Sequence, residues 1–365
     1  MDIRLFAGQG GMALHRDIIV IGASAGGFEA LKKLVADFPG DLDASVFVVW
    51  HMPADIRGLL PEVLNRCGPL HAANAFDKEE IRPGRIYVAP PDRHLLIESN
   101  TVRTTKGPRE NRFRPAVDPL FRSAAFTYRQ RVIGVILSGY LDDGTSGLWT
   151  VKHFGGVAVV QDPNDSVFPS MPENAIREVE VDHVVPIDEM GKLIARLASE
   201  EIDVSEVEME NERQVETEIK IAREDSAFES GVMKLGELSP YTCPDCHGVM
   251  MKLKDGKRMR FRCHTGHAYS ADSLLASVTE VIEESMWDTV RGIEESIMLL
   301  NQLGEHFSEE GNSSMAMLYF QKAREAEDRT QIIRQAIMQH ENLSTDEMRD
   351  QASNNNDRRE VSTGN

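Results

Sequence analysis

The stretch Asp17-Ile-Ile-Val-Ile-Gly-Ala-Ser-Ala-Gly-Gly-Phe28 decides the fold of the chain. Its β-branched run, Ile18 to Ile21, predicts a buried strand, and the small residues after it predict a tight turn. Apolar residues then recur at helical spacing over residues 28–38, so a helix is expected to follow. A strand, a turn of small residues and a helix typically open a doubly wound α/β domain. Ser24 lies in that turn, where the chain leaves the sheet.

Further apolar runs alternate with segments of helical spacing toward the carboxyl terminus. We predict strands at residues 45–50, 84–91, 94–97, 131–138, 156–161 and 182–185, with 84–91 and 94–97 paired around a proline turn. We predict helices at residues 56–67, 117–128, 146–154, 174–178 and 187–197. Strands that are apolar throughout and alternate with helices indicate a mostly parallel sheet with helices on both faces.

Composition limits the class of protein. The 365 residues carry a net charge of −19, which argues against a nucleic-acid binder, because phosphate binding needs clustered Lys and Arg. No apolar run approaches the roughly 20 residues of a membrane span, and residues 1–16 lack the pattern of a signal peptide. We therefore expect a cytoplasmic protein that does not insert into membranes.

Ser24 admits three interpretations. A dinucleotide site needs G-x-G-x-x-G and an acidic residue after the next strand, but Ser24 replaces the second glycine and His51 ends that strand. Helix capping is the usual role of a serine in such a turn. The third interpretation is a nucleophile, because residues 22–26 satisfy G-x-S-x-G, whose small residues permit a sharp turn with an exposed hydroxyl.

Two other strand ends favour the nucleophile. His51 ends the neighbouring strand, and Asp143 lies in the loop after the apolar strand near residue 135. The carboxyl ends of strands in an open parallel sheet meet along one crevice, so these side chains can converge on Ser24. A hydroxyl, an imidazole and a carboxylate are the nucleophile, base and orienting acid of a serine hydrolase.

Six segments carry a resemblance to a known family. They are, in order, IGASAGG, VVWHMP, GRIYVAPPDRH, RPAVDPLFRSAA, LSGYLDDGTSG and VVQDPNDSVFPSMPENA. Through these motifs, residues 17–197 resemble the catalytic domain of the CheB-type chemotaxis protein-glutamate methylesterases. That family hydrolyses glutamyl methyl esters on the cytoplasmic helices of chemoreceptors, and many members also deamidate receptor glutamines.

The resemblance implies a role for each member of the triad. Ser24 is the implied nucleophile, His51 the implied base and Asp143 the implied orienting carboxylate. Asp142 is the rival acid, but the acid of the family directly precedes the glycine. The reaction needs no cofactor, and methanol is released.

Residues around the triad receive weaker assignments. Backbone N–H groups near Ala25 and at Tyr140 are expected to hold the oxyanion. Arg114, in the R-P-A-V-D motif, either faces an acidic substrate or forms a salt bridge with Asp118 or another neighbour. The sequence has Tyr140-Leu141 where the family usually has Met-Gly, which changes the size of the residues that line the acid loop.

The leading hypothesis is a freestanding serine hydrolase that removes methyl groups from glutamyl methyl esters on a methylated chemoreceptor or related signalling protein. Typical family members carry a phospho-acceptor receiver domain ahead of the catalytic domain, and too few residues precede the first strand here to hold one. We therefore expect no regulation by phosphorylation in cis. The alternatives are a receptor glutamine deamidase with the same triad, and a signalling or scaffolding module that keeps the fold without catalysis.

A second site is predicted by four residues with zinc-ribbon spacing. They are Cys243, Cys246, Cys263 and His267. His247 and His264 are rival fourth ligands, but the spacing Cys-x-x-x-His lets Cys263 and His267 reach one ion from a single turn. The site has no evident open position, so structural zinc is favoured over catalytic zinc.

Changes in composition divide the chain into six predicted segments. They are an irregular amino terminus (1–16), the catalytic domain (17–198), a solvated acidic linker (199–238), the zinc-ribbon-like module (239–270), a helical hairpin (271–341) and a polar tail (342–365). The helices of the hairpin are predicted at residues 271–307 and 314–339, on either side of Gly311-Asn312. We expect this hairpin to offer a surface to other chemotaxis or two-component proteins.

Overall fold

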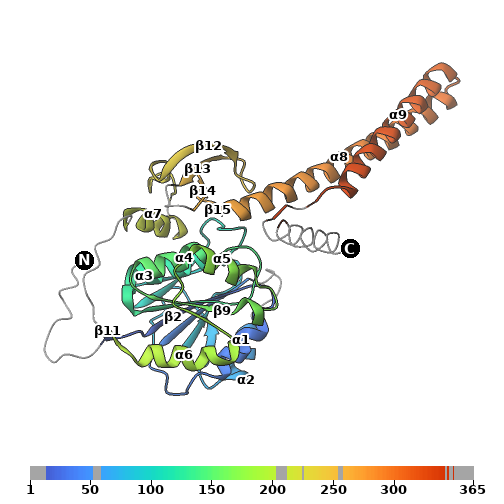
Figure 1. Cartoon of the computed structure of the whole chain (residues 1–365). Helices are drawn as coiled ribbons and strands as arrows, with labels where there is room; N and C mark the ends of the chain where they lie inside the picture. Colours follow the sequence, from blue (N-terminus) through green and yellow to red (C-terminus); the bar gives the residue numbers. More distant parts are fainter. Residues whose placement is uncertain are drawn as a thin grey trace, which may run out of the picture. The chain divides into compact units, whose positions relative to one another are not determined.

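A seven-stranded sheet forms the centre of the first half of the chain (Figure 1). The computed structural model describes residues 14–51, 59–202, 212–223, 226–253, 258–341, 343–344 and 348. The strand order is β10-β9-β8-β2-β3-β5-β4, and every neighbouring pair is parallel. The strands are β2 (Ile18–Ala23), β3 (Ser45–Trp50), β4 (His71–Asn74), β5 (Arg85–Val88), β8 (Val132–Ile136), β9 (Val157–Gln161) and β10 (His183–Val185). The predicted parallel sheet is confirmed.

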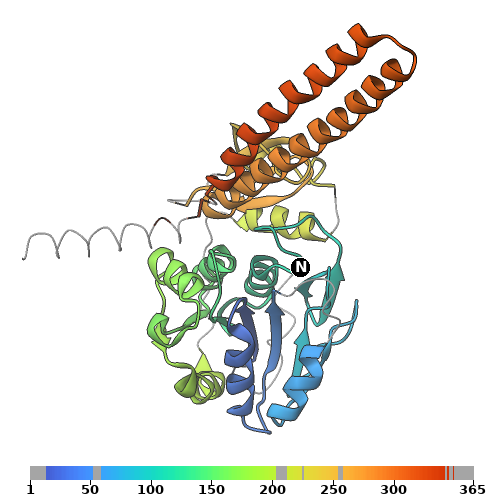
Figure 2. The ribbon, with the colours of Figure 1, turned by 90° about the vertical axis from the view of Figure 1, so that its right-hand side faces the viewer.

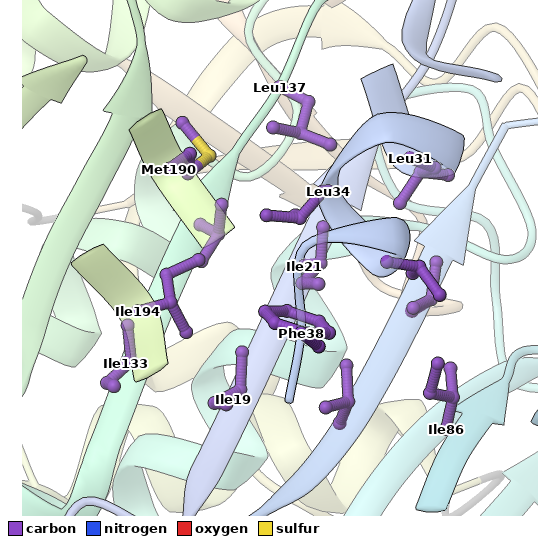
Figure 3. Packing of buried hydrophobic residues seen from close by; sticks show 14 of the residues in the cluster. Ile19, Ile21, Leu31, Leu34, Phe38, Ile86, Ile133, Leu137, Met190 and Ile194 are labelled. Atoms are coloured by element: carbon purple, nitrogen blue, oxygen red, sulfur yellow. The ribbon is translucent and has the colours of Figure 1, made fainter. Parts of the chain in front are cut away.

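Helices cover both faces of this sheet (Figure 1). One face carries α1 (Gly27–Ala36), α2 (Leu59–Cys67) and α6 (Ile187–Ser199), and the other carries α3 (Val117–Tyr128), α4 (Thr145–His153) and α5 (Ser170–Glu178). Because side chains alternate along a strand, β2 serves both cores. Ile19 and Ile21 pack in the cluster that contains Leu34 (Figure 3), whereas Ile18 and Val20 belong to the cluster on α3.

The strands after residue 84 differ from the prediction. β5 lies inside the parallel sheet, between β3 and β4, because its apolar residues require cover on both faces. β6 (His94–Glu98) pairs instead with β7 (Thr101–Thr105) in a separate antiparallel hairpin. The predicted pairing of 84–91 with 94–97 is therefore wrong. Neither β4 nor β7 was predicted, since both are too polar to resemble buried strands.

Both borders of the sheet region also differ from the predicted segments. Within the segment predicted to be irregular, β1 (Leu14–His15) pairs with β11 (Glu201–Ile202). Within the segment predicted to be a solvated linker, α7 (Glu212–Ala222) packs on α3 and buries Val215, Glu218 and Ile219. The burial of this acidic helix is favourable because Arg260 and Arg262 neutralise Glu218. Residues 1–13, 56–58, 203–211 and 254–257, and nearly all of the tail, lie outside the described residues.

Four short antiparallel strands follow α7, and we call them the ribbon. They are β12 (Gly236–Thr242), β13 (Val249–Leu253), β14 (Arg260–Cys263) and β15 (Ala268–Ser270). The chain divides into two compact units, Met1–Ser273 and Leu274–Asn365. The ribbon therefore belongs to the same unit as the parallel sheet.

The second unit is a hairpin of two long helices (Figure 2). They are α8 (Ala271–Glu309), whose first turn still belongs to the first unit, and α9 (Ser313–Met338). At the turn, Gly311 takes a φ of 78° and the Asn312 side chain accepts from the backbone N–H of Met315, which caps α9. The predicted helical hairpin is confirmed. Among the helices that the structure describes, none combines the length and apolar character of a bilayer span.

Candidate active site

Ser24 occupies the turn between β2 and α1. Gly26, at φ 70°, adopts the left-handed conformation that favours glycine. At Gly22, an added side chain would meet Val117 Cγ1 at 2.4 Å. In the G-x-S-x-G motif, the turn thus requires glycine at position 26, and the close approach of α3 requires glycine at position 22. α1 has no side-chain cap, so the structure contradicts the interpretation of Ser24 as a capping residue.

Ser24, His51 and Asp143 form one hydrogen-bonded row. Ser24 Oγ lies 3.1 Å from His51 Nδ1, and His51 Nε2 lies 2.8 Å from Asp143 Oδ2. The three residues follow β2, β3 and β8 at the carboxyl edge of the sheet, and they are only 8%, 9% and 1% exposed. If Asp143 is ionised, Nε2 must carry a proton, so Nδ1 presents its lone pair to the Ser24 hydroxyl.

Hydrogen bonds keep the Asp143 carboxyl ionised. Burial alone would raise its pKa, but the bond from His51, the backbone N–H of Val117 (2.6 Å) and Asn111 Nδ2 (2.9 Å) hold the pKa below its ordinary value. A buried carboxylate beside the imidazole stabilises the imidazolium that forms when the ring takes up a proton.

The rival carboxyl, Asp142, has a different environment. It accepts a hydrogen bond from Ser270 Oγ at 2.7 Å, and burial raises its pKa to about 8. Burial and the charge of Asp143 likewise raise the pKa of Asp118 to about 7. Of these three aspartates, Asp143 contacts the imidazole and is the one favoured as an anion at neutral pH.

Two contacts of the triad were not predicted from the sequence. The Phe113 ring stacks on His51, with centroids 3.8 Å apart and planes 9° apart. Asn111 donates through Nδ2 to Asp143 Oδ1 and to Asp118 Oδ2, both at 2.9 Å. Their only signal in the sequence is proximity to the R-P-A-V-D motif, since neither residue type points to an imidazole or a carboxylate.

The predicted oxyanion and substrate residues lie at the rim. Ala25 follows Ser24 directly and precedes the first residue of α1. Tyr140 lies in the loop after β8, is 51% exposed, and packs its ring against Phe168. Arg114 does not pair with Asp118. Its Nε and Nη2 bind Asp92 Oδ1 at 2.9 and 2.7 Å, so the alternative of a neighbouring salt bridge is the one that the structure contains.

Leu141 sits where the resembling family usually has glycine. Its φ is 60°, in the left-handed region that side chains other than glycine rarely adopt. The carbonyl oxygen of Leu141 accepts from Asn174 Nδ2 at 2.8 Å and from Ser170 Oγ at 3.2 Å. These two bonds from α5 hold the loop that carries Asp143. They keep Leu141 in a backbone conformation that glycine would adopt without strain.

The four predicted metal ligands come together in the ribbon. The ligand atoms of Cys243, Cys246, Cys263 and His267 all lie within 4.8 Å of one another, and the group includes neither His247 nor His264. The Sγ atoms of Cys246 and Cys263 are 3.7 Å apart, and Cys263 Sγ is 3.6 Å from His267 Nδ1. In a tetrahedron with metal–sulfur bonds of about 2.3 Å, sulfurs are about 3.8 Å apart, so these spacings fit one ion. They are far longer than a disulfide bond of about 2.0 Å.

Comparison with known proteins adds to this geometry. Residues 19–194 match the family model described as CheB methylesterase. A "putative protein-glutamate methylesterase/protein-glutamine glutaminase" of Leptospira interrogans is 39% identical over 185 residues, which are 50% of this chain and 96% of that protein. A "protein-glutamate methylesterase/protein-glutamine glutaminase" of Clostridium acetobutylicum is 37% identical over 182 residues, 50% of this chain and 53% of that protein. The crystal structure of the Thermotoga maritima CheB methylesterase catalytic domain is 34% identical, covers 50% of this chain and 98% of that one, and has a TM-score of 0.49.

Proposed function

Because the chain belongs to the CheB methylesterase family, we propose that it is a serine hydrolase of glutamyl methyl esters on chemoreceptor-type signalling proteins. The observation that carries the proposal is the buried row in which Ser24 Oγ, the His51 ring and Asp143 follow one another at 3.1 and 2.8 Å. The names of the Leptospira and Clostridium relatives state the same activity. Such a substrate places the reaction in the cytoplasm, where the receptor helices carry their methyl esters.

The reaction proceeds through an acyl-enzyme. His51 Nδ1 takes the proton of Ser24 Oγ while the oxygen attacks the ester carbonyl carbon. The bond to the methoxy oxygen then breaks, and that oxygen takes the proton from Nδ1 and leaves as methanol. Water attacks the acyl carbon, gives a proton to Nδ1, and the bond to Ser24 Oγ breaks. That proton returns to Ser24 Oγ, and the product leaves as glutamate after its carboxylic acid gives the second proton of the water to solvent. Asp143 stabilises the imidazolium at each transfer.

Backbone N–H groups of Ala25 and Tyr140 are the proposed oxyanion donors. The Ala25 N–H stands just before the amino end of α1, where the helix favours negative charge. Removal of one such donor typically costs about 3 to 4 kcal/mol of transition-state stabilisation. Arg114 is the proposed contact to an acidic substrate, and Asp92 together with the carbonyl oxygens of Lys106 and Gly107 fixes its guanidinium in place.

Glutamine deamidation is a second activity that the same site supports, and the names of both relatives include it. Ser24 Oγ would attack the amide carbon, His51 would protonate the amide nitrogen, and ammonia would leave from the resulting tetrahedral intermediate. The acyl-enzyme and its hydrolysis would be unchanged.

Structural zinc is the proposed occupant of the Cys3His group. Three thiolates and one imidazole with tetrahedral spacing form a closed site, without the open position that catalysis requires. When bound, the ion would cross-link the β12–β13 turn, which carries Cys243 and Cys246, to Cys263 at the end of β14 and His267 in the turn that follows.

The hairpin of α8 and α9 is the proposed contact for other chemotaxis or two-component proteins. Large apolar side chains stand exposed on it, including Leu299 at 56%, Met317 at 73% and Ile332 at 67%. A monomeric helix rarely leaves several such side chains in water, which supports the proposal that a partner helix covers them.

Methanol release by the full-length protein tests the proposed activity. The substrate is a purified chemoreceptor signalling domain that has been methylated with a radiolabelled methyl group. Ser24→Ala should lower the rate by at least about 10⁴-fold, because the nucleophile is lost. Ser199→Ala, which removes an exposed hydroxyl at the end of α6, is the matched control and should retain full activity. Equal rates in the two variants would rule out Ser24 as the nucleophile, and a wild-type protein that releases no methanol would favour the scaffolding module.

A further inference from the structure

Residues 109–113, which we call the bridging loop, contact both the proposed triad and the ribbon. On the triad side, Phe113 stacks on the His51 ring and Asn111 donates to Asp143. These two residues thus contact the base and the acid that follow Ser24 in the hydrogen-bonded row. They contact the base and the acid directly, and they act on the nucleophile through these two side chains.

On the ribbon side, the bridging loop is hydrogen-bonded to β15. The backbone N–H of Asn111 donates to the carbonyl oxygen of Ala268 at 2.8 Å, and the N–H of Ala268 donates to the carbonyl oxygen of Arg109 at 3.1 Å. The side-chain oxygen of Asn111 accepts from the backbone N–H of Ser270 at 3.0 Å and from Ser273 Oγ at 3.2 Å. β15 begins directly after His267, one of the four metal ligands.

The position of β15 therefore determines the orientation of the Asn111 amide. The backbone N–H of Ser270 can only donate, so it selects the Oδ1 side of the amide and directs Nδ2 at Asp143. Asn111 is 5% exposed, and rotating its amide would place Oδ1 against a carboxylate. Asn111 also has a φ of 48°, a left-handed conformation that asparagine tolerates better than most residues.

A buried ion pair fastens the same loop next to the metal group. Glu110 accepts from Arg262 Nη2 at 2.9 Å and from Arg122 Nη2 at 2.6 Å, and all three side chains are at most 1% exposed. Arg262 immediately precedes the ligand Cys263 in β14. The turn from Cys263 to His267 thus lies between the two strands that hold the bridging loop.

We propose that Asn111 and Phe113 are positioning residues for the triad, and that a metal ion in the ribbon keeps them in position. The inference rests on the proposed function of the triad. The ion joins Cys263 to His267 and so fixes the spacing of β14 and β15, to which the loop is bonded. Without it, Asp143 loses the donor from Asn111 and His51 loses its stacked ring. Misplaced catalytic groups weaken transition-state stabilisation more than substrate binding, so kcat falls while KM changes little.

Cys263→Ser in the full-length chain tests the link, and Cys67→Ser is its matched control outside the ligand group. We expect one zinc per chain in the wild type and in the control, and loss of zinc in Cys263→Ser. That loss should lower kcat for methanol release about 10- to 100-fold, with KM within about twofold. The low-field proton resonance of His51 Nε2–H bound to Asp143 should broaden or disappear together with the metal. Loss of zinc with full kcat and an unchanged resonance would overturn the inference.

Asn111→Gly keeps the inference testable if Cys263→Ser does not fold. Glycine accepts the left-handed backbone and leaves the ribbon and its ligands in place. We expect retained zinc, a kcat lower by about 10- to 100-fold and a shifted pH profile, whereas Asn100→Gly in the exposed β6–β7 turn should leave all three unchanged. Wild-type kinetics in Asn111→Gly would refute the positioning role. If the wild type released no methanol, the proposed function would fail, but the His51 resonance would still decide whether the metal controls the triad.

Discussion

Glu218 offers the sharpest test of what holds the ribbon against the sheet region. Its carboxylate lies 2.6 Å from Arg260 Nη2, 2.8 Å from Arg262 Nη2 and 3.7 Å from Arg122 Nη1. With Glu110, these five side chains form a buried cluster of three positive and two negative charges. The substitution Glu218→Gln keeps the shape of the side chain and removes one of the negative charges.

The magnitude follows from the burial of the cluster. Glu218 and Arg262 are at most 1% exposed and Arg260 is 7% exposed, so water cannot screen the charges that remain. Loss of one partner from a buried ion pair typically costs 3 to 5 kcal/mol. Glutamine keeps one of the two accepting oxygens, so we expect about 3 kcal/mol, which corresponds to about a 100-fold change in an equilibrium constant. Glu216, two residues earlier on α7, pairs with Lys220 at a surface where the pair is worth about 0.5 kcal/mol or less.

Hydrogen exchange of the full-length protein measures this difference locally. Amides of α7 and β14 should exchange about 100-fold faster in Glu218→Gln, and no more than about threefold faster in the matched variant Glu216→Gln. The arginines outweigh burial and hold the pKa of Glu218 well below its ordinary value. Its contribution is therefore complete above about pH 4.5 and is lost only at more acidic pH, as the carboxylate of the folded protein takes up a proton. Similar exchange in the two variants at neutral pH would refute the assignment of the cluster as the fastening of the ribbon.

Three further predictions concern the acid loop and the metal. Asp143→Asn should lower kcat for methanol release about 10⁴-fold, whereas Asp142→Asn should stay within about threefold, and equal losses would contradict the choice of acid. The raised pKa of Asp142, about 8, means that the fold favours its protonated form, so its contribution to stability is present at acidic pH and declines between about pH 4 and 8. Thermal denaturation should then find Asp142→Asn more stable than the wild type at pH 8 and similar to it at pH 4. Zinc removal by a chelator should open β12 to β15 to proteolysis, which a metal-independent ribbon would resist.

The sheet and the proposed triad were predictable because each depends on local pattern plus one rule of parallel sheets. Apolar runs located β2, β3 and β8, and the rule that carboxyl ends of parallel strands share one edge brought Ser24, His51 and Asp143 together. The same logic failed for β4 and β7, since His71–Asn74 and Thr101–Thr105 lack the apolar character on which it depends.

Contacts that depend on distant partners left no mark in the sequence. Glu218 stands in an acidic run, which is typical of solvated segments, and its burial is favourable because arginines of β14 and α3 surround it. Asn111 contacts Ser270, 159 residues further along the chain, and Glu110 contacts Arg262 across 152 residues. No local period or motif predicts such pairs, because neither partner is unusual for its own neighbourhood.

These distant pairs join the predicted catalytic segment, residues 17–198, to the ribbon. The predicted boundary at residue 198 follows a change in composition, but in a chain that ended there Glu110 would lack Arg262 and Asn111 would lack the backbone N–H of Ser270. Glu110 and Arg122 would then pair at a surface, where an ion pair is worth at most about 1 kcal/mol, instead of inside a closed cluster. The row of Ser24, His51 and Asp143 would remain, since the sheet alone positions its backbone. The bridging loop, which orients the base and the acid, would lose its contacts to the ribbon. The ribbon is therefore part of the structure that supports the proposed site, because the catalytic segment alone contains the reacting groups without all of the contacts that hold them.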